Sequence, residues 1–295
     1  MTDLDALGRT ALGVAYLRAR ESGRADALFQ DPLASALFSA AEGEDVASTP
    51  TADSGTGDSG PGDSGTGDRA RRGMYHWIVA RTLFFDELCR RAAADGVRQF
   101  VILGSGLDAR AFRLDLGTDS LVVELDRPAV IDVKESLVAE HGLAPTGTRR
   151  VVAADLTAEW WPALSSAGVT TDAPICWLAE GLLAYLAPEA VWRVIDTIGS
   201  ASVSGSRLGA TVRSGRARPA RDPYADVAKL WHPDPGIVER LTGTGWTCER
   251  TDAAAVLAAY GRDVCAPRTG ATIASRTGSN LLAARYGSVS VGVAD

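Results

Sequence analysis

The sequence predicts an α/β protein with a seven-stranded, doubly wound and mostly parallel sheet, an antiparallel edge and an α-helical lid. Three observations favour this fold. First, short apolar runs alternate with helical segments over residues 99–285. Second, a glycine-rich turn follows the first apolar run. Third, acidic residues follow several of the later apolar runs. Strands that alternate with helices form parallel sheets with helices on both faces.

Helical segments fill much of the region before the first strand. Apolar residues recur at helical spacing over residues 4–20, and Asp31 before Pro32 can cap a second helix. A third helix is expected over residues 74–94. We interpret residues 1–94 as an N-terminal helical lid region.

A five-residue repeat rich in Gly, Ser and Asp interrupts these helices. It reads DSGTG, DSGPG and DSGTG from Asp53 to Asp68 and contains no large apolar side chain. A segment without apolar surface to bury cannot offset its ordering entropy, so residues 44–70 are expected to form a disordered loop. A calcium-binding turn array is the less favoured interpretation, because the repeat lacks the nonapeptide pattern of calcium solenoids.

The core of the fold is expected over residues 95–295. Its strands are predicted at residues 99–103, 121–125, 149–153, 173–179, 207–212, 245–251 and 279–285. Its main helices are predicted at residues 128–141, 188–200 and 253–260. The last two strands, separated by one helix and a loop, fit an antiparallel edge. A lid insertion is expected at about residues 213–240.

Composition narrows the range of functions. The chain has 295 residues and a formal net charge of −7, so nucleic acid is not expected as a partner. It begins MTDLDALGRT, which lacks the basic and apolar regions of a signal peptide, and no run approaches 18 apolar residues. We expect a cytoplasmic protein with no membrane partner. Its four cysteines form no CxxC pair, and no metal site is expected. The composition leaves open whether the protein is a monomer or a homodimer.

The strongest local signal is the glycine turn after the first strand. Val101-Ile102-Leu103 is followed by Gly104-Ser105-Gly106 and then by a helical segment. Glycine allows a tight turn and lets a ligand approach the backbone, so these three residues are candidate cofactor contacts. The pattern also occurs in dinucleotide-binding folds, and a structural turn without a ligand remains an alternative.

Acidic residues mark the ends of the following strands. Asp126 lies about 20 residues after the glycines, where a carboxylate can hold ribose hydroxyls; an acidic helix cap is the alternative. Glu124 points to the same side of its strand and is a second candidate for the cofactor or the glycine turn. Asp155 and Leu156 are expected to meet an adenine edge. Glu180 follows an apolar strand and needs a partner if buried, either a cationic ligand or a structural salt bridge.

These motifs, in this order, resemble the leucine carboxyl methyltransferase family, and its bacterial branch most of all. The resemblance spans Ala11 to about Arg285 and departs from the family pattern in the repeat of residues 53–68. It rests on Ala80-Arg81-Thr82, Gln99 to Leu114, Glu124 to Pro128 with Lys134, Ala154 to Leu156 with Trp160, Ala179 to Leu186, Gly245-Trp246 and Tyr260 to Arg262.

The resemblance implies a Rossmann-like fold and S-adenosylmethionine as methyl donor. It implies that Gly104 and Gly106 approach the methionine part of the donor. Asp126 would hold the ribose, Asp155 and Leu156 would meet the adenine, and Glu180 would lie near the sulfonium and amino group.

The resemblance also implies that an arginine before the first strand holds the carboxylate of the donor. Arg81 matches the bacterial motif, whereas Arg72 could match the eukaryotic relatives. The spacing leaves both open.

The function expected from these features is O-methylation of a small organic molecule. A carboxylate acceptor needs no general base, whereas a phenol or enol would benefit from one. His76, His232 and Tyr185 are the candidates for catalysis or for orienting the acceptor. Aromatic residues in the expected lid favour an aromatic polyketide or another secondary metabolite, although ordinary core packing explains them equally well.

Two other functions share part of this pattern. A cyclase or regulator could bind S-adenosylmethionine without transferring its methyl group, because the donor contacts would be the same. An NAD-dependent oxidoreductase is less favoured, because the sequence has no Tyr-x-x-x-Lys pair to donate a proton near the nicotinamide.

Overall fold

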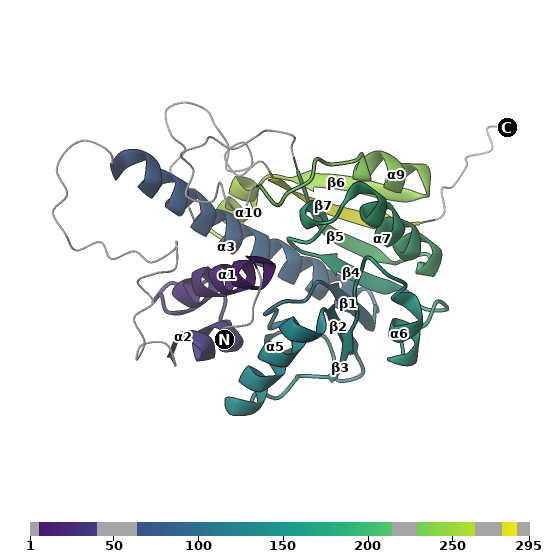
Figure 1. Cartoon of the computed structure of the whole chain (residues 1–295), viewed down its shortest axis with the longest axis horizontal. Helices are drawn as coiled ribbons and strands as arrows, with labels where there is room; N and C mark the ends of the chain where they lie inside the picture. Colours follow the sequence, from purple (N-terminus) through teal and green to yellow (C-terminus); the bar gives the residue numbers. More distant parts are fainter. Residues whose placement is uncertain (1–5, 40–63, 214–228, 263–278, 288–295) are drawn as a thin grey trace.

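The strands of this protein form one sheet in the order β3-β2-β1-β4-β5-β7-β6. A computed structural model describes residues 6–39, 64–213, 229–262 and 279–287 (Figure 1). The strands are β1 Gln99–Leu103, β2 Leu121–Asp126, β3 Thr148–Ala153, β4 Ile175–Ala179, β5 Arg207–Arg213, β6 Trp246–Thr251 and β7 Ser279–Tyr286.

The expected seven-stranded, mostly parallel sheet is confirmed. β1 pairs in parallel with β2 and β4, β2 with β3, and β4 with β5. β7 runs antiparallel to both β5 and β6 and lies between them. The antiparallel pairing therefore falls at one end of the sheet, with β6 as the outermost strand.

Side chains that alternate along the strands supply two separate cores. Phe100 and Ile102 of β1 pack with one apolar cluster, whereas Val101 and Leu103 pack with another. This alternation follows from the period of two in a strand and buries both faces of the sheet.

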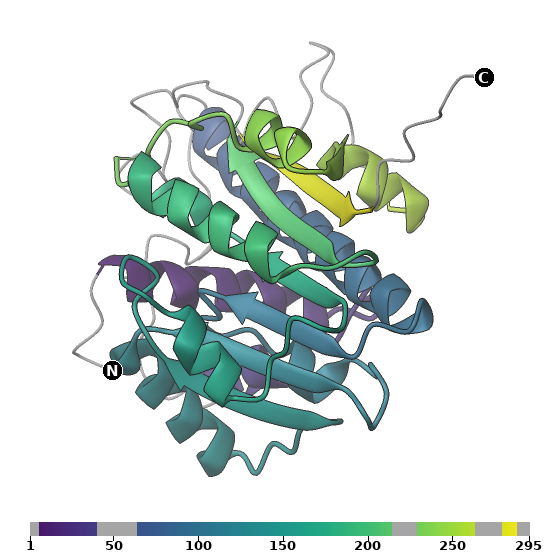
Figure 2. The ribbon, with the colours of Figure 1, turned by 90° about the vertical axis from the view of Figure 1, so that its right-hand side faces the viewer.

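Helices cover both of these faces. They are α1 Ala6–Ser22, α2 Pro32–Ser39, α3 Ser64–Ala94, α4 Arg110–Arg113, α5 Pro128–Glu140, α6 Trp161–Ser166, α7 Pro188–Ala201, α9 Ile237–Gly243 and α10 Ala253–Ala259, with a 3₁₀ helix, η3, at Leu183–Tyr185. Figure 2 shows α6 and α7 in front of the sheet and α1 and α3 behind it. Asp31 caps α2 as expected, because its Oδ1 accepts a hydrogen bond from the Ala34 N–H over 2.8 Å.

The longest helix, α3, begins within the last unit of the repeat. Residues 64–70 are helical, although the sequence predicted a disordered loop up to residue 70. A helix propagates more easily than it nucleates, so the well-packed turns that follow can extend into this segment. Residues 44–63 of the predicted loop lie outside the described residues.

The second half of α3 packs directly on the sheet. Phe85 and Cys89 belong to the same apolar cluster as β1 and β4. A Cβ atom on Gly209 of β5 would lie only 2.5 Å from Leu88 Cδ2, so glycine permits this close approach. This half of the helix therefore packs in the apolar core against the sheet. Most of the lid insertion expected at residues 213–240 lies outside the described residues.

A buried carboxylate ties the N-terminal helices to the chain after α10. The side chain of Glu21 on α1 is fully buried and accepts a hydrogen bond from the hydroxyl of Tyr75 on α3. Arg262 Nη1 donates to the same carboxylate over 2.6 Å, and the Leu28 N–H donates over 2.8 Å. Burial, and then the bond to Glu21, raise the pKa of Tyr75 to about 12.

No helix within the described ranges combines the length and the apolarity that crossing a membrane requires.

Candidate functional site

The carboxyl ends of the parallel strands bring the predicted site residues to one edge of the sheet. Leu103 pairs with Leu125, and Asp126 pairs with Ala153. Continuing the same register places Gly104 beside Asp126, and on its other side next to the residue that follows β4. Ligands bind at this edge in open α/β sheets.

The glycine turn adopts a backbone that only glycine takes up easily. Gly104 has a φ of 62° and Gly106 a φ of 46°. A Cβ atom on Gly104 would lie 2.9 Å from Leu182 Cδ1, whereas one on Gly106 would meet only Ala11 Cβ at 3.6 Å. Helix α1, which carries Ala11, therefore lies against this turn.

Ser105 lies between these glycines with its side chain buried. Its exposed fraction is 4%, and its Oγ has no hydrogen-bond partner within the described part of the chain. Buried polar atoms are usually paired, so this hydroxyl is available for a ligand at the turn. The free hydroxyl and the bare glycine backbone fit a donor that approaches the turn closely.

Asp126 closes the turn from the neighbouring strand. Its Oδ2 accepts the Gly106 N–H over 2.7 Å, and its Oδ1 accepts the Arg127 N–H over 2.7 Å. Burial raises the pKa of Asp126 although both bonds act to lower it. Each oxygen keeps a second lone pair, so the carboxylate can accept two ribose hydroxyls as well.

Glu124, the other acidic candidate on β2, lies inside the sheet. It pairs in register with Ile102 of β1 and has a fully buried side chain. Lys134 Nζ and Arg149 Nη2 each lie 2.7 Å from its Oε2. The strand period puts Glu124 on the same side as Asp126 but two residues short of the sheet edge. Its carboxylate therefore joins α5 and β3 to β2, and within the described residues its contacts are to Lys134 and Arg149 and not to the glycine turn.

Asp155 and Leu156 follow β3 with different surroundings. Asp155 is exposed, and its Oδ1 accepts hydrogen bonds from the N–H and the hydroxyl of Thr157, each over 2.8 Å. Both bonds lower the pKa of Asp155. Leu156 is buried in the apolar cluster beneath α6 and α7. The pair offers a carboxylate and an apolar surface beside each other.

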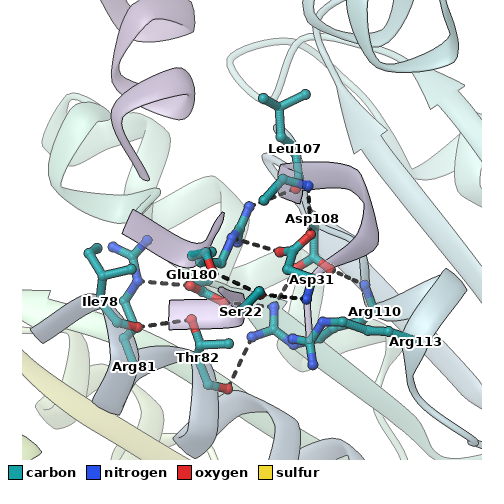
Figure 3. A network of polar contacts seen from close by, with 12 residues as sticks. Ser22, Asp31, Ile78, Arg81, Thr82, Leu107, Asp108, Arg110, Arg113 and Glu180 are labelled. Carbon is teal, nitrogen blue, oxygen red and sulfur yellow. Dashed lines mark hydrogen bonds and ion pairs between the residues drawn. The ribbon is translucent and has the colours of Figure 1, made fainter. Parts of the chain in front are cut away.

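Glu180, after β4, is held by two arginines (Figure 3). Arg81 Nε lies 2.8 Å from its Oε1, and Arg110 Nη1 lies 2.7 Å from its Oε2. Burial acts to raise the pKa of Glu180, but Arg110 and Arg81 outweigh it and hold the pKa below its usual value. This buried side chain is therefore ionised and fixed at the sheet edge.

Arg81 and Arg72 lie on the same helix in different environments. Nine residues separate them, which is about 14 Å along an α-helix. Arg72 is exposed, whereas Arg81 is largely buried and its Nη1 would lie 3.0 Å from a Cβ atom on Gly181. Of these two arginines, Arg81 is the one that the fold brings to Glu180.

Sequence reasoning did not single out the charged residues behind Glu180. Arg110 also pairs with Asp108 and lies 2.9 Å from Asp86 on α3, and Arg113 Nη2 lies 2.7 Å from the same Asp86. The available signal was the presence of these charged residues within an otherwise apolar turn and helix. Charges in such a segment require partners once buried.

Two of the three predicted catalytic side chains lie beyond β4 and β5. The rings of Tyr185 and Trp231 are 6.3 Å apart, and the guanidinium of Arg213 lies 5.1 Å above the Trp231 ring. The His232 N–H donates to Ala184 O over 2.7 Å, and the His232 side chain is exposed. The structure thus brings Tyr185 and His232 to the same part of the sheet edge.

His76 lies in a different setting. It is half-buried on α3, with its ring centroid 5.4 Å from that of Tyr75. Burial, followed by the charges of Arg262 and Arg72, lowers the pKa of His76. No described contact joins it to Tyr185 or His232.

Comparison with known proteins agrees with this arrangement. The sequence model of the leucine carboxyl methyltransferase family matches residues 11–199. A protein of Streptomyces coelicolor, provisionally named an S-adenosyl-L-methionine-dependent methyltransferase, is 39% identical, with 86% of this chain and 87% of the relative covered. A protein of Frankia alni with the same provisional name is 37% identical, with 89% and 93% covered.

Solved structures share the fold at lower identity. A DUF574 family protein from Streptomyces avermitilis matches with a TM-score of 0.51 and 18% identity, covering 79% of this chain and 93% of that one. A protein of Thermobifida fusca, provisionally described as a methyltransferase, matches with a TM-score of 0.53 and 20% identity, covering 75% and 86%. Both are Rossmann-like structures, and the likeness concerns the fold alone.

Proposed function

Since this chain belongs to the leucine carboxyl methyltransferase family and is an S-adenosylmethionine-dependent methyltransferase, we propose that it methylates an oxygen atom of a small organic molecule. The acceptor atom belongs to a carboxylate or a hydroxyl. The observation that carries this proposal is the ionised Glu180, held at the sheet edge between the glycine turn and the Tyr185–Trp231 pair.

Each donor contact follows from a group at that edge. Asp126 holds the ribose through the free lone pairs of its two oxygens, while Gly104 and Gly106 leave room for the methionine part. Arg81 binds the carboxylate of the donor, and Glu180 lies beside its amino group and sulfonium. Charge-assisted hydrogen bonds of this kind are stronger than neutral ones, so they fix the donor in one orientation.

The adenine end of the donor meets the segment after β3. Asp155 accepts a hydrogen bond from the exocyclic amino group, and the neighbouring Leu156 supports the apolar side of this segment. The Asp155 carboxylate is suited to this part because its lowered pKa keeps it ionised.

When bound, S-adenosylmethionine would supply a methyl group on a positively charged sulfur, which passes to the acceptor oxygen as neutral S-adenosylhomocysteine leaves, so the donor itself needs no activation. The residues of the enzyme therefore act mainly by holding the acceptor in line and by excluding water. A carboxylate acceptor needs no base. For a hydroxyl acceptor, His232 is the candidate base, and Tyr185 orients the acceptor.

The acceptor side favours an aromatic molecule. Tyr185 and Trp231 present two rings beyond β4, and the guanidinium of Arg213 stacks on one of them. Aromatic rings pack well against flat organic molecules. An aromatic polyketide or a related secondary metabolite fits this surface. The proposal keeps the expectation of a cytoplasmic enzyme. It also keeps the expectation of no nucleic-acid partner, which rests on the net charge of −7.

The test is methyl transfer from donor labelled in its methyl group. The purified protein is incubated with aromatic carboxylic acids and phenols, and separately with aliphatic acids and a peptide with a free C-terminus. We expect S-adenosylhomocysteine to form with aromatic acceptors and the label to pass into the organic extract. Alkali then distinguishes the acceptor atom, because it releases methanol from methyl esters and leaves methyl ethers intact.

Two outcomes would contradict the proposal. One is label bound to nitrogen or carbon in the product, located by mass spectrometry. The other is transfer to the peptide but to none of the small molecules. The Asp126→Ala variant is the control, because it lacks the ribose contact and should give only background label with every acceptor.

A further inference from the structure

The arginine that follows the glycine turn is a deeply enclosed cation near the donor site. Arg110 is the first residue of α4 and has an exposed fraction of 1%. Its guanidinium lies 5.5 Å from the centre of the Phe85 ring. A cation is this deeply buried only where several acceptors surround it.

Three carboxylates from three parts of the fold surround this guanidinium. Nε lies 2.9 Å from Asp86 Oδ1 of α3, and Nη1 lies 2.7 Å from Glu180 Oε2 after β4. Asp108, two residues after the glycine turn, completes the set. The rigid fork of an arginine suits such multiple contacts, whereas a lysine offers a single charged point.

These three carboxylates do not depend on Arg110 to the same degree. Asp86 also binds Arg113 through both of its oxygens. Asp108 also accepts the Arg110 backbone N–H over 2.7 Å, which a substitution at residue 110 would preserve. Glu180 has Arg81 as its other ion-pair partner in the described network. If Arg81 turns to a carboxylate of the donor, Glu180 relies on Arg110.

We propose that Arg110 is a positioning residue for the methyl donor: it fixes Glu180 through Oε2, so that this carboxylate stays in place when Arg81 binds the donor. The inference rests on the proposed donor contacts of Arg81 and Glu180. Arg110 need not touch the donor itself. It acts by holding the group that does.

The charges around Glu180 explain how this effect can be measured. Arg81 from α3, Arg110 from α4 and Arg18 from α1 act to lower its pKa, whereas burial and Asp108 act to raise it. Removal of Arg110 takes away the largest lowering influence, so the pKa of Glu180 rises. Glu180 then takes up a proton at a higher pH, and its hold on a cationic amino group is lost as the pH falls.

The experiment is calorimetric titration of S-adenosylhomocysteine into the Arg110→Gln variant between pH 5.5 and 8.5. The matched control is Arg113→Gln, which removes a neighbouring arginine of α4 that pairs with Asp86 but not with Glu180. For Arg110→Gln we expect Kd to rise about ten- to hundredfold at neutral pH, because loss of this ion pair leaves Glu180 Oε2 buried without a charged partner. Its affinity should also begin to fall at a higher pH than that of the wild type. Arg113→Gln should follow the wild-type pH profile.

A double-mutant cycle separates positioning from general destabilisation. In a Glu180→Gln background, Arg110→Gln should raise Kd much less than it does in the wild type, because the two residues act through one contact. Equal losses in both backgrounds would overturn the proposal, as would the same pH profile for Arg110→Gln and Arg113→Gln. If Arg110→Gln does not fold, Arg110→Lys is compared with Arg113→Lys. Indistinguishable Kd values for these two at every pH would likewise refute it.

Failure of the donor contacts themselves would look different. If the wild type does not bind S-adenosylhomocysteine, the proposed donor site is wrong whatever the variants do. If the wild type and Arg110→Gln bind it equally well, the donor site stands and only the role of Arg110 is wrong.

Discussion

Arg81 Nε and Glu180 Oε1 lie 2.8 Å apart, which joins α3 to the end of β4 across 99 residues of sequence. The family resemblance implied that Glu180 lies near the amino group of the donor, and it left Arg81 and Arg72 both open as the residue that holds the donor carboxylate. Those groups belong to one amino acid, so two side chains that bind them must lie close together. The ion pair provides that closeness before any donor arrives.

Arg81→Gln should weaken the binding of S-adenosylhomocysteine. A lost charged hydrogen bond is worth about 1.5–3 kcal/mol, so Kd should rise about ten- to hundredfold. Methylthioadenosine lacks the amino-acid part, and its Kd should change little in the same variant. Calorimetry with both ligands measures the difference. Arg72→Gln is the control, and a larger effect there than in Arg81→Gln would move the carboxylate contact to Arg72.

Donor affinity should fall in mild acid because of Asp126. Burial raises its pKa, whereas hydrogen bonds from Thr157 lower the pKa of Asp155, so Asp126 takes up a proton before Asp155 does. The protonated group is the weaker acceptor for ribose hydroxyls. S-adenosylhomocysteine and methylthioadenosine both contain the ribose, so their Kd values should rise together as the pH decreases.

Protonation of Asp126 should have the opposite effect on the folding stability of the ligand-free protein: it weakens donor binding but stabilises the fold. A carboxyl group whose pKa is raised by folding destabilises the folded state while it is ionised, and this cost disappears as the pH falls through the raised pKa. The shift in Tm that a saturating ligand produces should therefore shrink toward acid. Asp155→Asn should leave the midpoint of this change where it is. A pH-independent Kd for methylthioadenosine would show that Asp126 is not the titrating group.

Gly104→Ala should destabilise the protein by about 1–3 kcal/mol. Its positive φ costs a non-glycine residue about 1–2 kcal/mol, and the new methyl group would also press on Leu182 Cδ1. Gly199→Ala within α7 is the control and should stabilise the protein. A Cβ atom there meets nothing within 4 Å, and alanine favours a helix over glycine by about 1 kcal/mol. Urea denaturation should give the two variants opposite signs, and equal signs would contradict the backbone argument.

Tyr75→Phe should lower the free energy of unfolding by about 1–3 kcal/mol, because it removes a hydrogen bond from the buried Glu21. The phenol contributes fully below its unfolded pKa of about 10, and the contribution is lost as the pH rises through the folded value of about 12. Wild-type stability should therefore decrease over this interval, while that of the variant stays flatter. Tyr260→Phe, at a more exposed ring, should change stability by less than about 0.5 kcal/mol. Similar losses in both variants would argue against a special role for Tyr75.

The strands of this fold could be predicted from the sequence because strands buried on both faces consist mostly of apolar residues. β4 is a continuous apolar run, as is β1 after its first residue, Gln99, which is expected for strands covered on both faces. The start of α3 could not be predicted in the same way. Its first turns carry no apolar stripe, and their helical state follows from the packed turns after them.

The ion pairs between side chains could not be predicted from the spacing of residues along the sequence. Glu124 shares a strand side with Asp126, yet Lys134 and Arg149 reach it from α5 and β3 and bind its carboxylate inside the sheet. Arg110 stood in the recognised motif, but its partner Glu180 lies 70 positions further along the sequence. Such contacts depend on how elements pack, which the local pattern of apolar and polar residues does not encode.

The position of β7 affects the order in which the chain can assemble. β6 joins the sheet through β7, although it precedes β7 in the sequence. A chain that folds as it leaves the ribosome must therefore hold β6 without a neighbouring strand until residues 279–286 have emerged. A premature stop before Ser279 would remove two strands from the sheet instead of one. It would also leave β5 as an edge strand, whose unpaired N–H and C=O groups can bind strands of other chains.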